Sequence, residues 1–407
     1  MATTHTRSGQ RTVKFPRKAV LDGVAVVELE SGRPVFASNA TRRTTVDADA
    51  ELALSIPDHD AGRSAELLAA FRPGTFQALY VGNGTVSDAD IEAAADHRVG
   101  NLELGWIHCA YSSRGEAARH LVLDVRLETF FRFSHLVGFT ARHCDFDDEG
   151  LSAVSAGSWF SSVILEDTVV TPDGLDAASR SGLQELVYSE NRLTYPGAAS
   201  FGDWPDLARL TMNRAGLIDD QLGSIAALNR LVILELPNND IFRRISHCLD
   251  DLPNLRRLDL ARTRTNDTSI ESLSTLRNLQ RLDLSATTIT DDALAALTDI
   301  EGLTGLFLGS CDITNDGLAR IVEEHPNLTV LDVSRTLITP EAVPLLTRLP
   351  KLRRLEISRE MVCQEFLDLV DRFPSLEEFG FRGGVPFSPL AAELVDYFGA
   401  ANWIGAR

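Results

Sequence analysis

The residues whose types could do chemistry cluster between positions 143 and 150. His143, Cys144 and Asp145 are consecutive, and an imidazole, a thiol and a carboxylate are the groups of a cysteine nucleophile with its base. The acid-rich segment DFDDEG, residues 145–150, offers the oxygen ligands that calcium prefers. A GNG segment at residues 82–84 has glycines of the kind found in phosphate-binding loops. Which chemistry is available depends on the elements that hold these residues.

Those elements follow from a repeated pattern, of which residues 276–297, LRNLQRLDLSATTITDDALAAL, are one copy. Leu279, Leu282, Leu284 and Ile289 stand at offsets 0, 3, 5 and 10, which fits neither a continuous helix nor a continuous strand. Further copies begin at Phe76 and, less regularly, near residues 99–109, so the chain holds about thirteen units. The regular copies follow one another at intervals of 23–25 residues, with first positions at Leu136, Phe160, Leu183, Leu207, Leu231, Leu255, Leu279, Leu303, Leu328, Leu352 and Leu376.

Each unit is expected to form a short strand, a turn and a short helix. Offsets 0, 3 and 5 turn apolar side chains to one side of the strand. Offset 8 carries Thr, Asn or Cys in most units, and these side chains can satisfy backbone groups where the chain leaves the strand. Offset 11 carries helix N-cap types such as Asn266 and Thr290, and Pro172 and Pro340 follow at the first helical position. Stacked units would form one parallel sheet with helices on its other side.

The pattern resembles that of the leucine-rich repeat family over roughly residues 76–385. The residues that carry the resemblance include Leu255, Leu258 and Leu260, with Thr263 at offset 8. Within the family it is similar to the 24-residue subtype L-x-x-L-x-L-x-x-[TC]-x-I-T-D-x-x-L of ribonuclease-inhibitor-like, cysteine-containing and many bacterial repeats. The resemblance implies an α/β solenoid, a curved horseshoe with a concave parallel β-sheet and convex short helices.

The repeat offers a structural explanation for each chemical candidate. Cys144 takes offset 8, as Cys311 does in a later unit, and sequence neighbours at a strand exit do not converge on one substrate. The acids of residues 145–150 lie where each unit begins its helix, a position that favours negative charge, and the segment lacks the spaced acids of an EF-hand loop. Residues 82–84 are interpreted as a turn. We therefore predict no catalytic residue, no metal ligand and no cofactor site.

The chain divides by pattern into several expected segments. Residues 1–20 are basic and are expected to form a flexible arm or to fold back on the acidic remainder of the chain. Residues 21–75 are expected to form a β-rich N-terminal cap that includes a hairpin. Residues 76–385 hold the repeats, with an irregular insertion at about 107–130 that is either a degenerate unit or a functional feature. Residues 386–407 are expected to form a C-terminal capping helix. A recruiting role for residues 21–75 is the alternative to a cap.

Composition excludes some classes of partner. Lys and Arg number 39 against 58 Asp and Glu, and the net charge of −19 repels nucleic acid and anionic membranes but attracts basic proteins. The five cysteines are scattered without CxxC spacing, and neither a secretory signal nor a membrane-spanning apolar run is found. We expect a cytoplasmic protein whose partner is a basic protein.

Candidate partner-binding residues lie on the predicted concave face. Strands about 4.8 Å apart bring charged side chains of successive units within range of one another. One interpretation is a docking surface with an aromatic anchor; the other is a solvated charge ladder whose Asp residues belong to the repeat pattern. The candidates are Glu235, Asp259, Asp283, Phe307, Asp332 and Glu356 at offset 4, and the flanking Arg257, Arg281 and Arg354. Earlier units carry uncharged residues at offset 4, namely Tyr80, Thr140, Ile164, Val187 and Thr211.

These observations predict a non-catalytic scaffold that binds another protein on its concave face. A sharper version is a bacterial acidic inhibitor or immunity-type protein directed against a basic partner, in line with the resemblance and the charge. One alternative is a substrate adaptor whose N-terminal region recruits other machinery. A further alternative is an enzyme with an unrecognised site.

Overall fold

The structure, a computed structural model, describes most of the chain. Contacts divide the chain into two compact units, Met1–Leu207 and Ala208–Arg407, which are called unit 1 and unit 2 and are described separately. The described residues are 4–5, 10–15, 24–30, 33–39, 43–47, 50–56, 64–81, 85–104, 122–124, 136–156, 160–178, 182–191, 204–242, 245–382 and 403–404.

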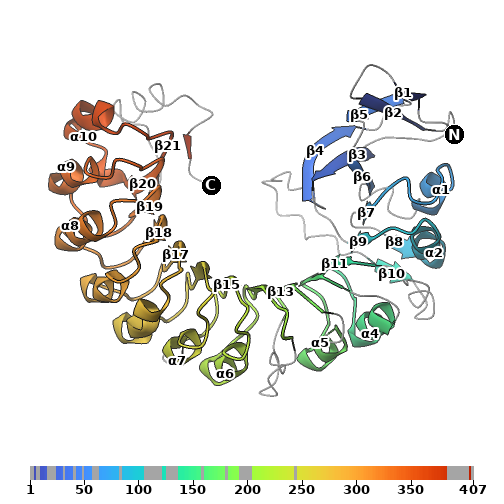
Figure 1. Ribbon diagram of the computed structural model, residues 1–407, viewed down its shortest axis with the longest axis horizontal. Coiled ribbons are helices and arrows are strands. Elements are labelled where there is room, and N and C mark those ends of the chain that lie inside the picture. The colour runs from blue at the N-terminus through green and yellow to red at the C-terminus, as the bar shows by residue number, and fades with distance from the viewer. Residues whose placement is uncertain are drawn as a thin grey trace. The chain divides into compact units, whose positions relative to one another are not determined.

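Unit 1 contains a run of parallel strands with helices on one side (Figure 1). Neighbouring strands pair so that equivalent positions of successive repeats lie opposite each other, as in Phe139 opposite Val163 and Val163 opposite Leu186. The parallel strands are β7 (Ala78–Val81), β9 (Asn101–Leu104), β11 (Gly138–Arg142), β12 (Ser162–Glu166) and β13 (Glu185–Ser189). The helices are α1 (Ser64–Leu68), α2 (Asp88–Asp96), α4 (Asp148–Ala156) and α5 (Pro172–Ala178).

Antiparallel strands precede the first parallel strand of unit 1. The predicted hairpin is present, since β3 (Ala25–Glu30) pairs antiparallel with β4 (Arg33–Asn39), and β3 also pairs with β6 (Glu51–Ile56). Strand β6 then pairs in parallel with β7, which continues this sheet into the repeats.

The flexible arm expected over residues 1–20 is wrong for part of that segment. Strand β2 (Gln10–Lys14) pairs with both β1 (Thr4–His5) and β5 (Arg43–Asp47). The physical reason is the burial of apolar side chains. Val13 and Phe15 are each only 4% exposed, and the Phe15 ring packs edge-on against Phe71 with 5.2 Å between the ring centres. The burial of two apolar side chains outweighs the basic character of the segment.

Unit 2 repeats one strand, one turn and one helical segment (Figure 1). Its parallel strands are β14 (Arg209–Thr211), β15 (Ile233–Glu235), β16 (Arg257–Asp259), β17 (Arg281–Asp283), β18 (Gly305–Phe307), β19 (Val330–Asp332), β20 (Arg354–Ser358), β21 (Glu378–Arg382) and β22 (Trp403–Ile404). Its helical segments are η4 (Asp219–Gln221), α6 (Leu222–Ile225), α7 (Ile245–Leu249), η5 (Asp267–Thr275), η6 (Asp291–Leu297), α8 (Asn315–Glu324), η7 (Pro340–Ala342), α9 (Val343–Leu346), η8 (Arg359–Met361), α10 (Gln364–Leu369) and η9 (Val370–Arg372).

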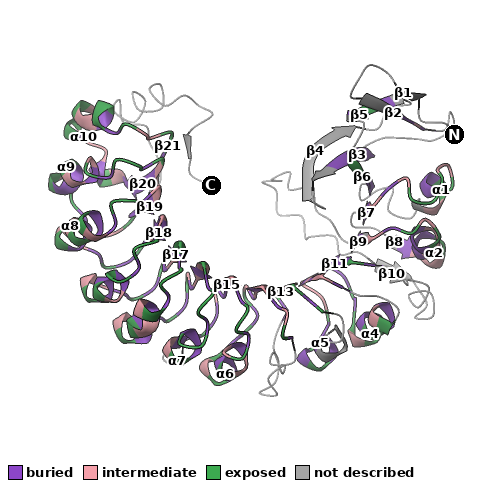
Figure 2. Cartoon of the chain, in the orientation of Figure 1, coloured by how far each residue is buried: buried purple, intermediate pink, exposed green. Residues whose placement is uncertain are grey.

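The core of each unit lies between its strands and its helices, and the buried residues are coloured purple along the cartoon in Figure 2. Strand leucines such as Leu186 and Leu331 are fully buried, and so is Leu318 from helix α8. Each buried leucine contributes about 1.5–3 kcal/mol relative to an exposed one. The predicted α/β leucine-rich repeat solenoid is confirmed.

The turn after each of the strands β11 to β19 places one residue in the left-handed region, which is uncommon for residues other than glycine. The position is offset 7 in every case, although its residue types have little in common. The residues, with φ between 50° and 65°, are His143, Asp167, Glu190, Arg214, Asn238, Arg262, Ala286, Ser310 and Arg335. The next residue then binds the backbone as predicted; in Asn239, for example, Oδ1 accepts the Leu217 N–H at 3.0 Å and Nδ2 donates to the Met212 carbonyl at 2.6 Å.

The helix starts carry the predicted caps, and they also link successive units. The Asn266 side chain accepts the Ser269 N–H, and the Thr290 side chain accepts the Asp292 N–H. In addition, both carboxylate oxygens of Asp267 accept bonds from the backbone and hydroxyl of Thr290, at 2.8 and 2.9 Å. Acids in the first helical turn therefore serve the neighbouring unit as well as their own helix end.

Two predicted segments lie largely outside the described residues. Of the insertion at about 107–130, only β10 (Val122–Asp124) is described, paired in parallel with β8 (Thr85–Ser87). Of residues 386–407, only β22 is described, and it pairs with β21 as a strand. A capping helix is therefore wrong at residues 403–404, where backbone pairing to β21 takes its place.

Candidate partner-binding site on the open face of unit 2

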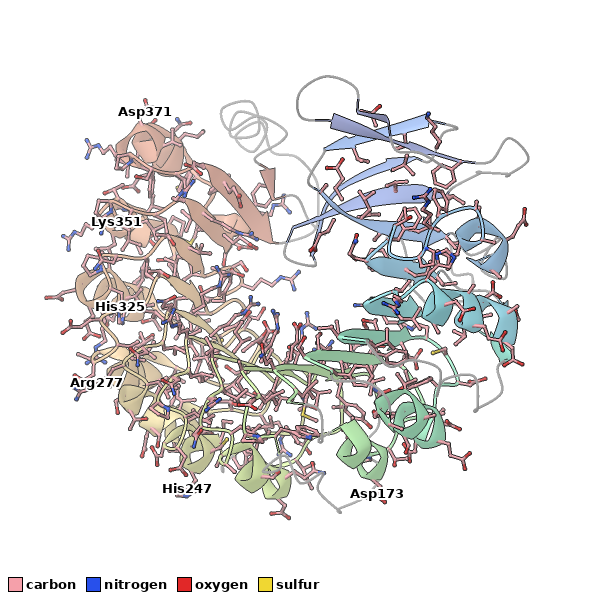
Figure 3. The ribbon with its side chains drawn as sticks, turned by 45° about the vertical axis from the view of Figure 1, so that its right-hand side comes forward. Asp173, His247, Arg277, His325, Lys351 and Asp371 are labelled. Carbon is pink, nitrogen blue, oxygen red and sulfur yellow. The ribbon has the colours of Figure 1, made fainter. Side chains whose placement is uncertain are left out.

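The sheet of unit 2 has one face covered by helices and one face without them, which we call the open face. Strand register aligns two columns of side chains on it, one at offset 2 and one at offset 4. In Figure 3 the labelled Arg277, Lys351 and Asp371 lie on the helical side instead, away from the open face. The nine predicted site residues all belong to the two open-face columns.

Three acids of the offset-4 column hold the turn that follows their own strand. One carboxylate oxygen of each accepts a backbone N–H two residues later: Asp259 from Ala261, Asp283 from Ser285 and Asp332 from Ser334, all at 2.9 Å. Asp332 is only 2% exposed. These bonds favour the interpretation that Asp at this position belongs to the repeat itself.

The two glutamates of the column are neutralised by arginines. Glu235 lies 2.7 Å from Arg257 and 3.3 Å from Arg209, and it also accepts the Thr211 hydroxyl at 2.8 Å. Glu356 lies 2.7 Å from Arg354. Both glutamates are buried, so each is a structural ion-pair partner rather than an accessible contact.

Strand β18 interrupts both columns. It carries Gly305 where the two preceding strands, β16 and β17, carry arginine, and Phe307 where they carry aspartate. Arg281 occupies the space that a side chain at Gly305 would need, since a Cβ there would lie 3.2 Å from its Cγ and 3.7 Å from its Cζ. The guanidinium carbon of Arg281 lies 5.1 Å from the centre of the Phe307 ring, a cation–π contact.

The interruption opens a pocket of about 230 Å³ on the open face. Buried Leu258 and Leu282 contribute to its lining. Six of the nine predicted residues also line it, and Glu235, Asp332 and Glu356 do not. The six are Arg257, Asp259, Arg281, Asp283, Phe307 and Arg354.

Charge crowding perturbs the groups of this pocket. The pKa of Asp259 is raised to about 6, chiefly by burial and next by Asp283; the Ala261 N–H opposes this rise, Glu235 adds to it and Arg257 opposes it. The pKa of Arg281 is lowered by burial and by the nearby cations Arg257 and Arg354, while Asp283 and Glu235 oppose the lowering. Three guanidinium groups thus approach one another closely enough to interact.

Sequence reasoning found the columns but missed what makes the pocket. Gly305 received no role, although its missing side chain is the space that Arg281 fills. Phe307 was expected as an exposed anchor and is instead half-buried under Arg281. A glycine replacing arginine at one register position was the available signal.

The other chemical candidates have structural roles. Cys144 is 3% exposed, and burial raises its thiol pKa to about 12, so the thiolate that a nucleophile needs is not formed near neutral pH. His143 Nδ1 lies 3.0 Å from an Asp167 carboxylate oxygen of the next unit. Asp147 Oδ1 accepts the Gly150 N–H at 2.8 Å, as a helix cap does. Residues 82–84 lie outside the described residues.

The described residues include neither a metal-binding cluster nor a membrane-spanning helix. They contain no group of three or more His, Cys, Asp or Glu side chains arranged to hold a metal ion. None of the helices described is both long and apolar enough to cross a membrane.

Comparisons place this geometry in a family. The chain matches a model described as a leucine-rich repeat region over residues 183–399, more than half of its length. It is similar to an internalin, InlF, of Listeria monocytogenes, with 17% identity, a TM-score of 0.53 and coverage of 81% of this chain and 86% of that chain. Internalin C2 of the same species is 22% identical with a TM-score of 0.36, and the match covers 51% of this chain and 83% of that chain.

A further solved structure is the Arabidopsis receptor kinase HAESA in complex with the peptide hormone IDA and the co-receptor SERK1, at 16% identity and a TM-score of 0.48, covering 79% of this chain and 61% of that chain. No curated protein matches the sequence. At these identities the structural likeness shows the fold alone. The family model and the fold agree, and the chain belongs to the leucine-rich repeat family.

Proposed function

We propose that this protein is a non-catalytic scaffold that binds another protein on the open face of unit 2. The leucine-rich repeat fold is typical of protein–protein interaction scaffolds. The observation that carries the proposal is the interruption at β18, where a pocket holds an aromatic ring and three arginines. Arginine and aromatic residues are enriched among the residues that dominate binding energy.

The partner is proposed to be basic overall. A net charge of −19 creates a long-range field that accelerates encounter with a cationic protein. An acidic inhibitor or immunity-type protein, resembling ribonuclease inhibitors in its repeat, is the sharper form of this proposal. We also propose a cytoplasmic location, which the free thiols of Cys144, Cys248, Cys311 and Cys363 support because disulfides are rare there.

The alternative of a substrate adaptor gives residues 21–75 a recruiting role. Strand β6 pairs with β7 through parallel register from Ala53 opposite Ala78 to Ile56 opposite Val81. The end of the repeat sheet is thereby covered by further strands, which supports a cap, because a solenoid needs its terminal units sealed from water.

Affinity capture with two matched charge variants tests the scaffold proposal. The full chain would be compared with Arg281→Gln on the open face and Arg277→Gln on the helical side, which remove the same charge four residues apart. We expect one partner in near-stoichiometric amount from the full chain and from Arg277→Gln, and less from Arg281→Gln. Equal capture by both variants would contradict binding on the open face. Affinity that does not change between low and high salt would contradict the basic partner alone.

A further inference from the structure

The pocket of the open face contains one cation, Arg281, that forms no close ion pair with a carboxylate among the described residues. Arg257 and Arg354 are paired with Glu235 and Glu356 at 2.7 Å. Within the described residues, no carboxylate oxygen lies within 4.0 Å of the guanidinium nitrogens of Arg281. The guanidinium group instead makes a cation–π contact with the Phe307 ring. Arg281 is also the most accessible of the three arginines, being exposed where the other two are half-buried.

The two aspartates of the pocket do not form an ion pair with Arg281 within 4.0 Å, although Asp283 attracts it at longer range. Each already directs one carboxylate oxygen to the backbone N–H of its own turn, Asp259 to Ala261 and Asp283 to Ser285. Both are half-buried, whereas Arg281 extends over Gly305 toward the ring of the neighbouring strand. The accessible charge of the pocket is therefore positive, against the negative sign of the whole chain.

Three guanidinium groups around one small space are well suited to a planar anion. A guanidinium donates two parallel N–H bonds to a carboxylate, a geometry that a lysine cannot provide. Arg257 and Arg354 both act on Arg281 as like charges, and an anion among them would relieve that repulsion. The Phe307 ring offers apolar surface to the methylene groups that carry such an anion.

The size of the pocket limits what it can hold. At about 230 Å³ it is smaller than a typical small-molecule site of roughly 300–1,000 Å³. One amino-acid side chain fits that space. We propose that the pocket binds the side-chain carboxylate of a glutamate on the partner protein, with Arg281 as the principal donor and Phe307 against the glutamate methylenes.

This inference rests on the proposed scaffold function and refines it. The negative field of the whole chain would bring a basic partner close, while one acidic side chain of that partner would set its register in the pocket. Charge complementarity over long range and a single buried anchor are separate contributions to recognition.

The test uses the full chain and small probes of defined charge. N-acetylglutamate α-amide carries one side-chain carboxylate, and N-acetylglutamine α-amide has the same shape without the charge. Binding would be followed by the side-chain Nε–Hε resonances of the arginines in NMR titrations. We expect saturable shifts with the glutamate probe and at least tenfold weaker binding of the glutamine probe, because hydrogen bonds to charged groups contribute about 1.5–3 kcal/mol.

Two variants separate the pocket from general charge. Arg281→Gln should weaken the glutamate probe about tenfold or more, and Arg277→Gln on the helical side should change its affinity less than about twofold. Gly305→Val, which fills the space of Arg281, should weaken binding while leaving all three arginines in place. Unchanged thermal melting of Arg281→Gln would show that the loss is local.

Several outcomes would overturn the inference. Equal binding of the two probes, equal effects of the two Gln variants, or saturable binding of inorganic phosphate without binding of the glutamate probe would each do so. Failure of the inference is distinguishable from failure of the scaffold proposal. If a captured partner depends on the open face but no glutamate probe binds, only the inference fails. If the probe binds and no partner is captured, the scaffold proposal fails, and with it the assignment of the carboxylate to a partner protein, while carboxylate binding by the pocket stands.

Discussion

The sheets of unit 1 and unit 2 share the buried strand positions and the turns of the repeat, which we call the frame. They differ in the residues at offset 4. In unit 1 this position holds the uncharged Thr140 on β11, Ile164 on β12 and Val187 on β13, and a single charged residue among the described strands, Glu103 on β9. In unit 2 acids occupy it on β15, β16, β17, β19 and β20, and these acids either bond the following turn or pair with arginines. The strand positions that face the helices are apolar and buried in both units. The frame thus leaves the open-face positions free to vary, and unit 2 uses them to build a charged pocket.

The frame positions should be equally important in the two units. Leu186→Ala in unit 1 and Leu331→Ala in unit 2 remove fully buried side chains from offset 3 of β13 and β19. Each should lower the free energy of unfolding by about 2–5 kcal/mol, because the cavity that remains is only partly refilled. Urea unfolding followed by circular dichroism measures the loss. A loss below about 1 kcal/mol in one unit only would break the comparison.

The acids of the unit 2 column should contribute to stability through their turns. Asp332→Ala removes the acceptor for the Ser334 N–H from a side chain that is 2% exposed, at a cost of about 1–3 kcal/mol. Asp332→Asn keeps an oxygen acceptor and should cost less. The same unfolding experiment reads both. An asparagine variant as unstable as the alanine variant would show that charge, not the hydrogen bond, is what matters there.

His325 is an exception in the frame of unit 2. It stands at a position that carries Leu276 and Leu349 in other units, it is 3% exposed, and neither of its ring nitrogens has a hydrogen-bond partner. Burial lowers its pKa below the ordinary 6.5, opposed by Glu324, so the folded state binds fewer protons than the unfolded state. Protonation of His325 therefore does not affect the free energy of unfolding above pH 6.5, and it lowers this free energy as the pH falls below that value.

His325→Leu should accordingly raise the free energy of unfolding by about 1 kcal/mol and weaken its dependence on pH between 5 and 7. Thermal melting at several pH values measures both effects. A leucine variant with unchanged pH dependence would assign that dependence to other groups.

The pKa of the Asp259 carboxyl group tests the charged pocket that distinguishes unit 2. Its raised pKa of about 6, against an ordinary 3.8, means that the folded state binds more protons between these values, so its stability contribution falls as the pH rises through that window. Because Asp283 is the second cause of the rise, Asp283→Asn should lower the Asp259 pKa. Carbon-13 NMR titration of the carboxyl groups measures the midpoint. A midpoint near 4 in the unaltered protein would contradict the crowded pocket.

Much of the frame follows from local sequence. The caps Asn266 and Thr290 and the backbone-binding Asn239 were predictable, because each acts on groups within its own or the adjacent unit at a fixed offset. The left-handed residue at offset 7 was not, because Arg262, Ala286 and Ser310 share no side-chain property that favours φ above zero. There the conformation is imposed by the turn that surrounds the residue.

The pocket was predictable only in part. Its charged members stand at regular offsets, but Arg354 reaches it from a strand two positions beyond Gly305, and its depth depends on side-chain conformations. The pairing of β2 with β5 was likewise hidden, since it joins segments about thirty residues apart with few apolar residues. Both cases depend on contacts that no repeat offset specifies.

Site-specific photo-crosslinking in the native cell tests the central claim most directly. A photoreactive phenylalanine analogue would replace Phe307 on the open face of unit 2, Ile164 at the same offset of unit 1, or Arg277 on the helical side. We predict one discrete crosslinked protein from position 307, absent from position 277 and lost when Arg281→Gln is added. Crosslinking from position 277 with none from position 307 would contradict the account.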